Sequence, residues 1–415
     1  MSVTLSKFAR EVQPENAFTV LSAARQLQAA GKDVIELEIG DSPFPSTTHA
    51  VAAGIEAIRS GQTHYCASSG LPELREVASR AVDDRFDLTT TAEHIVVGPG
   101  AKTFQQLFCE AFLEPGDGVL VFGPYFPTYP PNIARRGARM YVVPLLEEEE
   151  FRPNPQQVAK FLEQDPRPKA IFLNSPHNPT GGVATEDDLR AIADIIRGRD
   201  AVVFSDEPYE HMVWRGRHHT LLAQPDMLEK CVSAYMFSKS YSMSGWRVGY
   251  AVSSPSICQT FGTLINTALS CVPPLAQFAA AAALTGDSEE RDRNMRAFGE
   301  KVAALAAGLD RIPGIRCRPP AGTFYVFPNV TEICNRHRIT SHGLAMYLLE
   351  GADDKQGVAC LGGECFGKEG HGYLIFSCAE PSELIEQALE LIARAVENSD
   401  RIGKYLGAHP RYRLV

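Results

Sequence analysis

Short apolar runs alternate with helix-length segments between about residues 94 and 250, and this alternation constrains the fold more than any other feature of the chain. Short apolar runs match buried strands, and helices between them favour a mostly parallel sheet. The runs that we interpret as strands span residues 94–97, 118–122, 140–143, 170–173, 201–204, 232–237 and 247–252. The sequence therefore predicts an α/β fold whose sheet is flanked by helices, with ligands bound beyond the carboxyl ends of the strands.

A smaller unit is predicted after the sheet region. Residues 289–293 are all charged, which indicates a long, solvated connecting helix. Beyond it, the apolar run 324–327 and the helical stretch 383–397 indicate a smaller α+β domain. At 415 residues the chain is long enough for two domains. No role is assigned to the tail at residues 402–415.

Charge and hydropathy limit the partners that we expect for this chain. The net charge of −10 and the pI near 5.6 argue against a nucleic-acid-binding surface. Residues 1–7 contain no apolar stretch of signal-peptide length, and the longest apolar stretch, residues 275–284, is too short to span a bilayer. The ten cysteines form no Cys-x-x-Cys pair, which favours reduced thiols and argues against zinc. We expect a cytoplasmic protein with no membrane, nucleic-acid or metal partner.

Lys239 follows the run 232–237 in a turn rich in glycine and serine, and it is the strongest candidate for a catalytic residue. A lysine held in a dry pocket has a lowered pKa, so that its amine forms a Schiff base with a carbonyl. Arg247, eight positions later, is suited to clamp a phosphate with two hydrogen bonds. Pyridoxal 5′-phosphate (PLP) carries both groups. A lysine taken alone is usually a solvated surface residue, so the flanking motifs must support the hypothesis.

The segment 237–250 resembles the lysine motif of fold-type I PLP enzymes, in the class I/II aminotransferase family that includes aspartate aminotransferase. The resemblance runs over about residues 36–396, with the motifs in the family's order. It implies a mostly parallel sheet of the seven-stranded type in a large PLP-binding domain at residues 47–288. It also implies a small α+β domain at residues 289–415, while residues 1–46 form an N-terminal arm and part of that small domain.

Two motifs at strand ends resemble the family's contacts to the pyridine ring. Asp206 is implied to keep the ring nitrogen protonated, so that the ring accepts electrons from the substrate's α-carbon. Tyr209, in the same Ser-Asp-Glu-Pro-Tyr motif, is implied to donate to the ring oxygen. Asn178, in an Asn-Pro-Thr-Gly turn, is implied to contact the ring oxygen and the substrate. Without the resemblance, Asp206 is equally a helix N-cap, and turn chemistry alone explains the prolines and glycines.

The turn between the run 94–97 and the expected helix 101–112 is predicted to bind the cofactor phosphate. Backbone amides at a helix N-terminus bind phosphate well, although the glycine spacing completes neither a Walker nor a Rossmann motif. The family often has a serine where this chain has Met236, so the hydroxyl role falls to Ser238 or Ser240. The residues implied to form the phosphate cradle are Gly100, Ala101, Lys102, Ser238 and Arg247.

Three further residues are implied to contact the cofactor or the substrate. Phe126 is expected against the pyridine face, although a phenylalanine is ordinarily a core residue. Tyr65 resembles the tyrosine that reaches the phosphate of the neighbouring subunit, which implies a homodimer with shared active sites. Gly40 resembles the contact position of a segment that closes over the substrate, but a strand end followed by a turn explains it equally well.

The chain departs from the family pattern where the substrate carboxylate is bound. Ile375 occupies the place of the family's arginine, two residues before a serine, here Ser377. Losing one partner of a desolvated charge pair costs about 2–5 kcal/mol, or roughly 30-fold to several thousand-fold in affinity. Residues 361–364 also replace the usual proline-glycine turn. The candidate cations to replace the arginine are Arg10, Lys102, Lys368 and His371.

The motifs leave two functions open. The first is an aminotransferase for an amino acid or related amine, in which Lys239 binds PLP as a Schiff base and shuttles the proton between the substrate's Cα and the cofactor. The second is another PLP reaction of specialised metabolism (elimination, replacement, cyclisation or decarboxylation), which Ile375 suggests. A DNA-binding regulator on the same fold would need an appended basic domain, for which the chain has no spare length.

Overall fold

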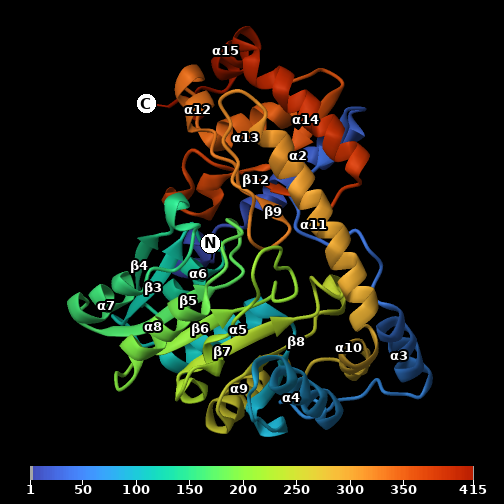
Figure 1. Cartoon of the computed structure of the whole chain (residues 1–415), viewed down its shortest axis with the longest axis vertical. Coiled ribbons are helices and arrows are strands. Elements are labelled where there is room, and N and C mark those ends of the chain that lie inside the picture. The colour runs from blue at the N-terminus through green and yellow to red at the C-terminus, as the bar shows by residue number, and fades with distance from the viewer. Residues whose placement is uncertain (1–2, 415) are drawn as a thin grey trace.

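The computed structural model describes residues 3–414, which form a lower part built on a large sheet and an upper part of helices and short strands (Figure 1). The large sheet has seven strands in the order β2-β8-β7-β6-β5-β3-β4. They are β2 (Ile95–Gly98), β3 (Gly118–Gly123), β4 (Arg139–Pro144), β5 (Pro168–Asn174), β6 (Val202–Asp206), β7 (Cys231–Met236) and β8 (Gly249–Val252). Only β8 runs antiparallel to its neighbours. The predicted α/β fold with a mostly parallel sheet is confirmed.

The turn that carries Lys239 is longer than the sequence predicts, because β7 ends at Met236 and β8 begins only at Gly249. Arg247 was expected in a strand, and this prediction is wrong. The residue follows a short 3-10 helix, Ser244–Trp246, and has a φ of 55°, in the left-handed region. Its backbone therefore lies outside the sheet, and its guanidinium reaches the turn after β2.

Helices cover both faces of the large sheet (Figure 1). They are α3 (Thr48–Arg59), α4 (Pro72–Phe86), α5 (Ala101–Phe112), α6 (Tyr129–Arg135), α7 (Pro155–Gln164), α8 (Glu186–Ile196), α9 (Pro255–Leu269) and α10 (Pro274–Gly286). On one face, the ring of Phe108 in α5 lies 5.5 Å from those of Phe172 in β5 and Phe204 in β6. This packing fixes α5, so that its N-terminus lies at the carboxyl edge of the sheet.

The long helix α11 (Ser288–Asp310) runs along one side of the molecule between the two parts, and it contains the charged stretch for which a connecting helix is predicted (Figure 1). The upper part contains α12 (Thr331–His337), α13 (Ser341–Glu350), α14 (Ser382–Glu397) and α15 (Ser399–Ala408), with β9 (Tyr325–Val326), β10 (Gln356–Ala359), β11 (Leu361–Gly362) and β12 (Leu374–Ser377). The tail, which received no prediction, forms α15 and buries Tyr412 against the core.

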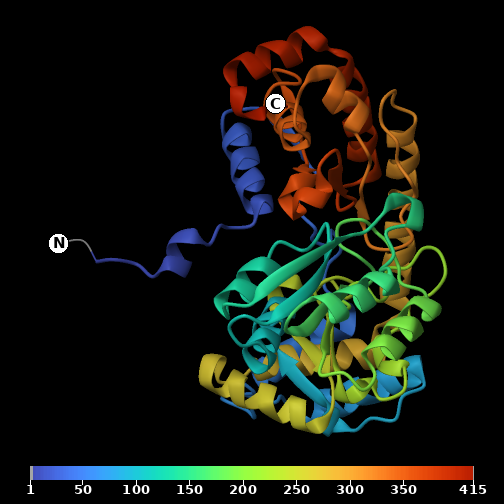
Figure 2. The same ribbon diagram turned by 90° about the vertical axis from the view of Figure 1, so that its left-hand side faces the viewer.

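The N-terminal residues join the upper part. β1 (Asp33–Glu36) pairs in parallel with β10, so that Asp33 lies opposite Gln356. α2 (Asn16–Ala29) lies beside the upper part, whereas α1 (Lys7–Glu11) extends away from the body (Figure 2). The start of α2 and the residues after β1 thus lie near the large sheet's carboxyl edge. The division of the chain at residues 46 and 288 stays a prediction.

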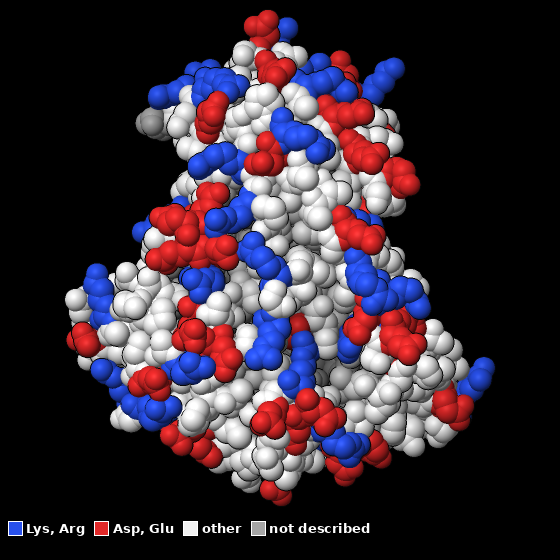
Figure 3. All heavy atoms as spheres, in the orientation of Figure 1, with Lys and Arg blue, Asp and Glu red and all other residues white. Residues whose placement is uncertain are grey.

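The surface charges and the cysteines do not indicate a particular ligand or partner. Basic and acidic side chains are interspersed over the face shown in Figure 3. No helix within residues 3–414 is long and apolar enough to cross a membrane. The ten cysteines are free thiols and most are buried. Within the same described range, no cluster of three or more His, Cys, Asp or Glu side chains could hold a metal ion.

Candidate active site

A cavity of about 490 Å³ lies at the carboxyl ends of β5, β6 and β7. The structure brings together around it most of the residues predicted to bind a cofactor. They are Ala101, Lys102, Phe126, Asn178, Asp206, Tyr209, Ser238, Lys239 and Arg247. These side chains come from separate stretches of sequence. The cavity is therefore the candidate active site.

Lys239 projects into this cavity from the turn after β7. Its Nζ donates a hydrogen bond to the backbone oxygen of Gly40 at 2.6 Å and lies 5.4 Å from the centre of the Phe324 ring. Burial lowers the pKa of the amine from its ordinary value to about 8. A substantial fraction of the lysine is thus neutral near physiological pH, and the neutral amine is the nucleophilic form.

Asp206, the last residue of β6, lies at the floor of the cavity and is only 3 % exposed. Its Oδ2 accepts hydrogen bonds from the Tyr129 hydroxyl at 2.7 Å and from Gln105 Nε2 at 3.2 Å. Its Oδ1 is buried and has no partner. Burial raises the pKa of the carboxyl to about 6. One oxygen is therefore held by the protein, while the other is an unpaired acceptor.

Sequence analysis missed Tyr129 and Gln105, although both lie close to residues that it named. Tyr129 comes three residues after Phe126, and Gln105 lies one turn of α5 after Ala101. Helical spacing would have placed Gln105 on the same face as the phosphate turn. The sequence does not show that both point at Asp206.

Asn178 and Tyr209 form a second polar pair in the cavity. Asn178 Nδ2 donates to the Tyr209 hydroxyl at 3.2 Å, whereas Asn178 Oδ1 is buried without a partner. The backbone amide of Asn178 donates to Oδ1 of Asn174, the last residue of β5, which holds the turn against the sheet. Burial raises the pKa of Tyr209, so that its hydroxyl stays protonated. The hydroxyl accepts from Asn178 and is also hydrogen-bonded to the side chain of Tyr325.

The turn after β2 and the guanidinium of Arg247 form a basic corner of the cavity. Gly100 has a φ of +109°, and a Cβ added to it would lie 2.3 Å from Arg247 Nη2, so glycine is required there. Arg247 donates to the backbone oxygens of Pro99 at 2.8 Å and Ser244 at 2.7 Å. The first turn of α5 begins next to it, at Ala101. Backbone amides and a fixed cation together suit an anion.

Hydroxyl groups complete this corner. Ser238 lines the cavity, and so does Ser244, which sequence analysis did not single out. Ser240 was the alternative to Ser238, but it is fully buried and lies outside the cavity lining. Met236 lines the cavity at the position where the family often has a serine. Ser238 is therefore the better placed of the two predicted hydroxyls.

Lys102 connects the cavity to the N-terminal region. Its ammonium forms an ion pair with Glu15 and lies 5.7 Å from the centres of both the Phe126 and Phe18 rings. Glu15 and Phe18 were not predicted, because nothing local in the sequence indicates that the start of α2 reaches this site. Phe126 itself lines the cavity as predicted.

A second compartment of about 190 Å³ continues from the cavity toward the upper part. The two share six lining residues, which are Phe18, Lys102, Phe126, Asn178, Lys239 and Tyr325. Gly40 lines this compartment, and a Cβ added to it would meet the Tyr325 hydroxyl at 1.8 Å. The walls that belong to this compartment alone include Glu38, Ile39, Leu361, Cys365 and Phe366. Gly40 therefore allows the chain to approach Tyr325 beside Lys239.

Ile375 is 2 % exposed and packs in the core rather than lining either compartment. It lies opposite Leu361 in the antiparallel pair β11–β12, and Leu361 does line the smaller compartment. Of the four candidate cations to replace the missing arginine, only Lys102 lines the cavities; the others are Arg10, Lys368 and His371. Lys102 is already paired with Glu15.

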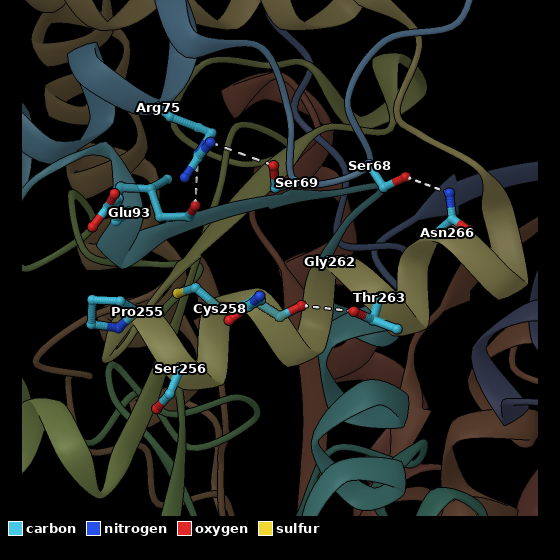
Figure 4. A pocket seen from close by; sticks show the side chains of 12 residues that line it. Ser68, Ser69, Arg75, Glu93, Pro255, Ser256, Cys258, Gly262, Thr263 and Asn266 are labelled. Carbon is cyan, nitrogen blue, oxygen red and sulfur yellow. Dashed lines mark hydrogen bonds between the residues drawn. The ribbon is translucent and has the colours of Figure 1, made fainter.

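Tyr65 is not brought into the site. It is 88 % exposed and lies outside both cavity linings of this chain. A separate cavity of about 720 Å³ is lined by residues of α4 and α9, at the bottom of Figure 1, and Figure 4 shows it from close by. There the Arg75 guanidinium lies near Ser69, and Asn266 of α9 donates to Ser68 at 3.0 Å. This larger hollow contains none of the predicted catalytic residues.

Comparison with known proteins agrees with this fold and this site. Residues 32–392 match the aminotransferase class I and II family. The aspartate aminotransferase of Bacillus subtilis (strain 168) is 32 % identical over 398 residues, which cover 95 % of this chain and 99 % of the relative. The probable aspartate/prephenate aminotransferase of Aquifex aeolicus is 33 % identical over 390 residues, which cover 93 % of this chain and 97 % of the relative.

Solved structures give the same result. The aspartate aminotransferase from Thermus thermophilus with maleate superposes with a TM-score of 0.87 at 30 % identity, covering 95 % of this chain and all of the other. An alanine aminotransferase from Pyrococcus furiosus has a TM-score of 0.86 at 29 % identity over the same shares. The sheet, its helices and the lysine turn define the fold of PLP-dependent enzymes of fold type I. The chain belongs to the aminotransferase class I and II family, and it is an aminotransferase.

Proposed function

We propose that this aminotransferase binds PLP in the cavity of about 490 Å³ that Lys239 lines, with Lys239 holding the cofactor's aldehyde carbon. The observation that carries this proposal is Asp206 Oδ1, a buried acceptor without a partner, in a cavity that is also lined by Lys239, whose pKa is lowered to about 8, and by the basic corner. A protonated ring nitrogen would satisfy Oδ1, and a phosphate would satisfy the amides and the guanidinium of Arg247. When bound, PLP supplies an electron sink for the carbon that bears the amino group.

The protein's own groups account for the orientation of such a cofactor. Asp206 would hold the ring nitrogen, while Tyr209 would donate its hydroxyl proton to the ring oxygen and Asn178 would keep that hydroxyl aligned. Tyr129 and Gln105 fix the carboxylate of Asp206, which limits its rotation. Phe126 would cover one face of the ring.

The phosphate end would be held at the basic corner. The residues that would bind it are Gly100, Ala101, Lys102, Ser238 and Arg247, through the backbone amides of the α5 N-terminus, a hydroxyl and the guanidinium. Lys102 contributes its backbone amide there, because its side chain is paired with Glu15. The phosphate anchor therefore depends largely on backbone geometry.

Lys239 Nζ would also move the proton of the reaction. A pKa of about 8 lets the amine take up a proton from the substrate carbon and release it again near neutral pH. The hydrogen bond to the Gly40 oxygen holds Nζ at the junction of the two compartments. The reaction moves an amino group from a donor to a carbonyl acceptor.

The donor is proposed to be an amino acid or a related amine, and the acceptor a keto acid. This follows from the relatives, which are named for aspartate and prephenate. No observation favours elimination, replacement, cyclisation or decarboxylation over amino-group transfer. The missing arginine at Ile375 leaves open how a substrate is anchored.

A homodimer with shared active sites is proposed from the exposure of Tyr65. Tyr65 is 88 % exposed, so its ring is free to contact a second copy of the chain. Ile55, Ile58 and Leu269 are exposed large apolar side chains as well. A second copy that covers this face would also cover the hollow of Figure 4 and would bring Tyr65 to the partner's phosphate corner.

We further propose that the protein acts in the cytoplasm on small molecules, without a nucleic-acid or membrane partner. The net charge of −10 supports this proposal, because it disfavours binding to polyanions. Fractionation of the cells that make the protein would test it: an activity that sediments with membranes contradicts the proposal.

Lys239→Ala tests the proposed chemistry. The wild-type protein reconstituted with PLP should show a visible absorbance band that shifts when an amino donor is added. The band should return to its first position when a keto acid is then added. The variant should lack the shift and lose activity by at least about 10²–10⁴-fold, while far-ultraviolet circular dichroism confirms that it folds. Full activity in the variant, or a wild-type spectrum that no donor changes, contradicts the proposal.

A further inference from the structure

Glu38 is a buried carboxyl that the proposed chemistry does not use. It is 3 % exposed, and both of its side-chain oxygens lack a hydrogen-bond partner. It lines the smaller compartment together with Lys239 and Gly40. Burial raises the pKa of this carboxyl to about 7. A buried polar group without a partner is costly, and in a site it indicates a missing ligand.

The surroundings of Glu38 favour a ligand that donates hydrogen bonds. The compartment's other walls are largely apolar and aromatic, with Leu361, Phe366 and Tyr325 among them. Its other acid, Glu15, is paired with Lys102. Among the described residues that line the compartment, Glu38 is thus the charged side chain with neither a partner nor a proposed catalytic role.

The same location explains why an isoleucine stands at position 375. The amide of Ser377 in β12 donates to the backbone oxygen of Leu37 at 2.7 Å, so that β12 runs directly beside the residue before Glu38. Ile375 lies two residues earlier on that strand, opposite Leu361. Ile375 is apolar and therefore offers no cation to the segment that carries Glu38.

We propose that the smaller compartment selects a primary amine that carries a second amino group, and that Glu38 binds this second group in place of an α-carboxylate clamp. This inference rests on the proposed function, because it assigns the donor of the same reaction. An ammonium beside Glu38 converts the unpaired carboxyl into a charge-assisted hydrogen bond. Transfer of the reacting amino group leaves its carbon as a carbonyl and turns the carbonyl acceptor into an amine, so the reaction balances without another reactant.

The chain geometry limits the spacing of the two nitrogens. The Gly40 oxygen is 2.6 Å from Lys239 Nζ, where the reacting nitrogen would lie. Glu38 comes two residues earlier, and two residues of chain span at most about 7 Å. A compartment of about 190 Å³ also accepts only a short ligand. The expected donor is therefore a short diamine, for which 1,4-diaminobutane is the probe.

One feature of the smaller compartment favours a negatively charged ligand rather than an ammonium. The first residues of α2, Asn16 to Phe18, also line the compartment, and a helix N-terminus attracts anions. A carboxylate bound there would meet the unpaired carboxyl of Glu38, which is unfavourable unless Glu38 is protonated. Binding of an α-amino carboxylate is accordingly the outcome that competes with the proposal.

Equilibrium binding to the PLP-loaded protein tests the inference. We would measure dissociation constants by calorimetry, and shifts in Tm, for 1,4-diaminobutane, n-butylamine and L-norvaline. The diamine should bind the wild type about 10- to 100-fold more tightly than the monoamine, the range of a hydrogen bond to a charged group. Glu38→Gln should remove this difference and leave n-butylamine unchanged. Glu163→Gln is the control, because Glu163 is exposed on α7 and lies outside the compartment.

Ile375→Arg provides a second variant that does not alter Glu38. It should weaken binding of 1,4-diaminobutane and strengthen that of L-norvaline, each by about tenfold or more. Equal affinity of the wild type for diamine and monoamine, an unchanged preference in Glu38→Gln, or tightest binding of L-norvaline to the wild type would each overturn the inference. If L-norvaline shifts the visible absorbance while the diamine has no advantage, only the inference fails. If no amine shifts it, the proposed function fails.

Discussion

The cofactor side and the substrate side of the site differ in how their polar groups are arranged. On the cofactor side, Asp206 and Asn178 each have one side-chain atom with a fixed partner and leave one buried oxygen unpaired. On the substrate side, Glu38 has no partner at all, and Ile375 replaces a cation. The proposed PLP cofactor would account for the first arrangement, which follows the family pattern, and the proposed diamine donor would account for the second, which departs from it.

The charges on the two sides also differ in sign. The cofactor side brings Arg247 and the α5 N-terminus to one corner, which suits a phosphate. The substrate side offers an unpaired carboxyl among apolar walls, which suits a cation or another hydrogen-bond donor. One site can thus bind an anionic cofactor and a cationic substrate, because their binding groups lie on different parts of the chain.

Asp206→Asn should have a larger effect than any substitution on the substrate side. Asparagine keeps the shape and the contacts of the side chain but not the charge that would hold a protonated ring nitrogen. We expect the rate of amino-group transfer in a single turnover to fall by about 10²–10⁴-fold. Asp200→Asn, at an exposed aspartate, is the control and should leave the rate unchanged. An unaffected Asp206→Asn enzyme would show that the cofactor side is not organised around this carboxylate.

Lys239→Met should stabilise the protein when PLP is absent. Burial disfavours the ammonium, so the folded-state pKa of about 8 lies below the ordinary value of 10.5. Below pH 8 the cost of burying the charge is fully present, and it disappears as the pH rises from 8 through 10.5. The variant should therefore gain about 1–3 kcal/mol at pH 7, and the gain should shrink above pH 8.

Urea unfolding across this pH range measures the effect. Lys404→Met, at an exposed lysine of α15, is the control and should show no such pH-dependent gain. If the wild type and Lys239→Met have the same stability at pH 7, then burial does not destabilise the ammonium, and the cofactor side lacks the neutral amine assigned to it.

The sequence predicted most of the residues that gather around the cavity of Lys239, because their motifs are local. Asp206 ends a buried strand, Lys239 follows another, and the α5 N-terminus follows a third, so that strand ends alone bring them to one edge of the sheet. The position of Arg247 was harder to predict from the sequence. A left-handed turn moved it out of the predicted strand, and the apolar run 247–252 gave no sign of this.

The substrate side could not be predicted in the same way. Glu38 and Glu15 enter the site because β1 pairs with β10 and because α2 packs beside the upper part, both of which join segments far apart along the chain. No local pattern specifies such a pairing. The sequence did identify Ile375 as a departure, but only the structure shows that an unpaired carboxyl lies near it.

Substitution of Lys102 tests the difference between the cofactor side and the substrate side most directly, because Lys102 lines both compartments. Its pairing with Glu15 ties the start of α2 to α5, and a partly exposed ion pair is worth about 0.2–1 kcal/mol. Lys102→Gln should therefore change the dissociation constants of donors by only about two- to fivefold. Glu15→Gln should have the same effect, and the double variant should be no weaker than either single one. If Lys102→Gln instead weakens L-norvaline more than about 100-fold while Glu15→Gln does not, Lys102 is the cation that replaces the missing arginine, and the substrate side binds a carboxylate after all.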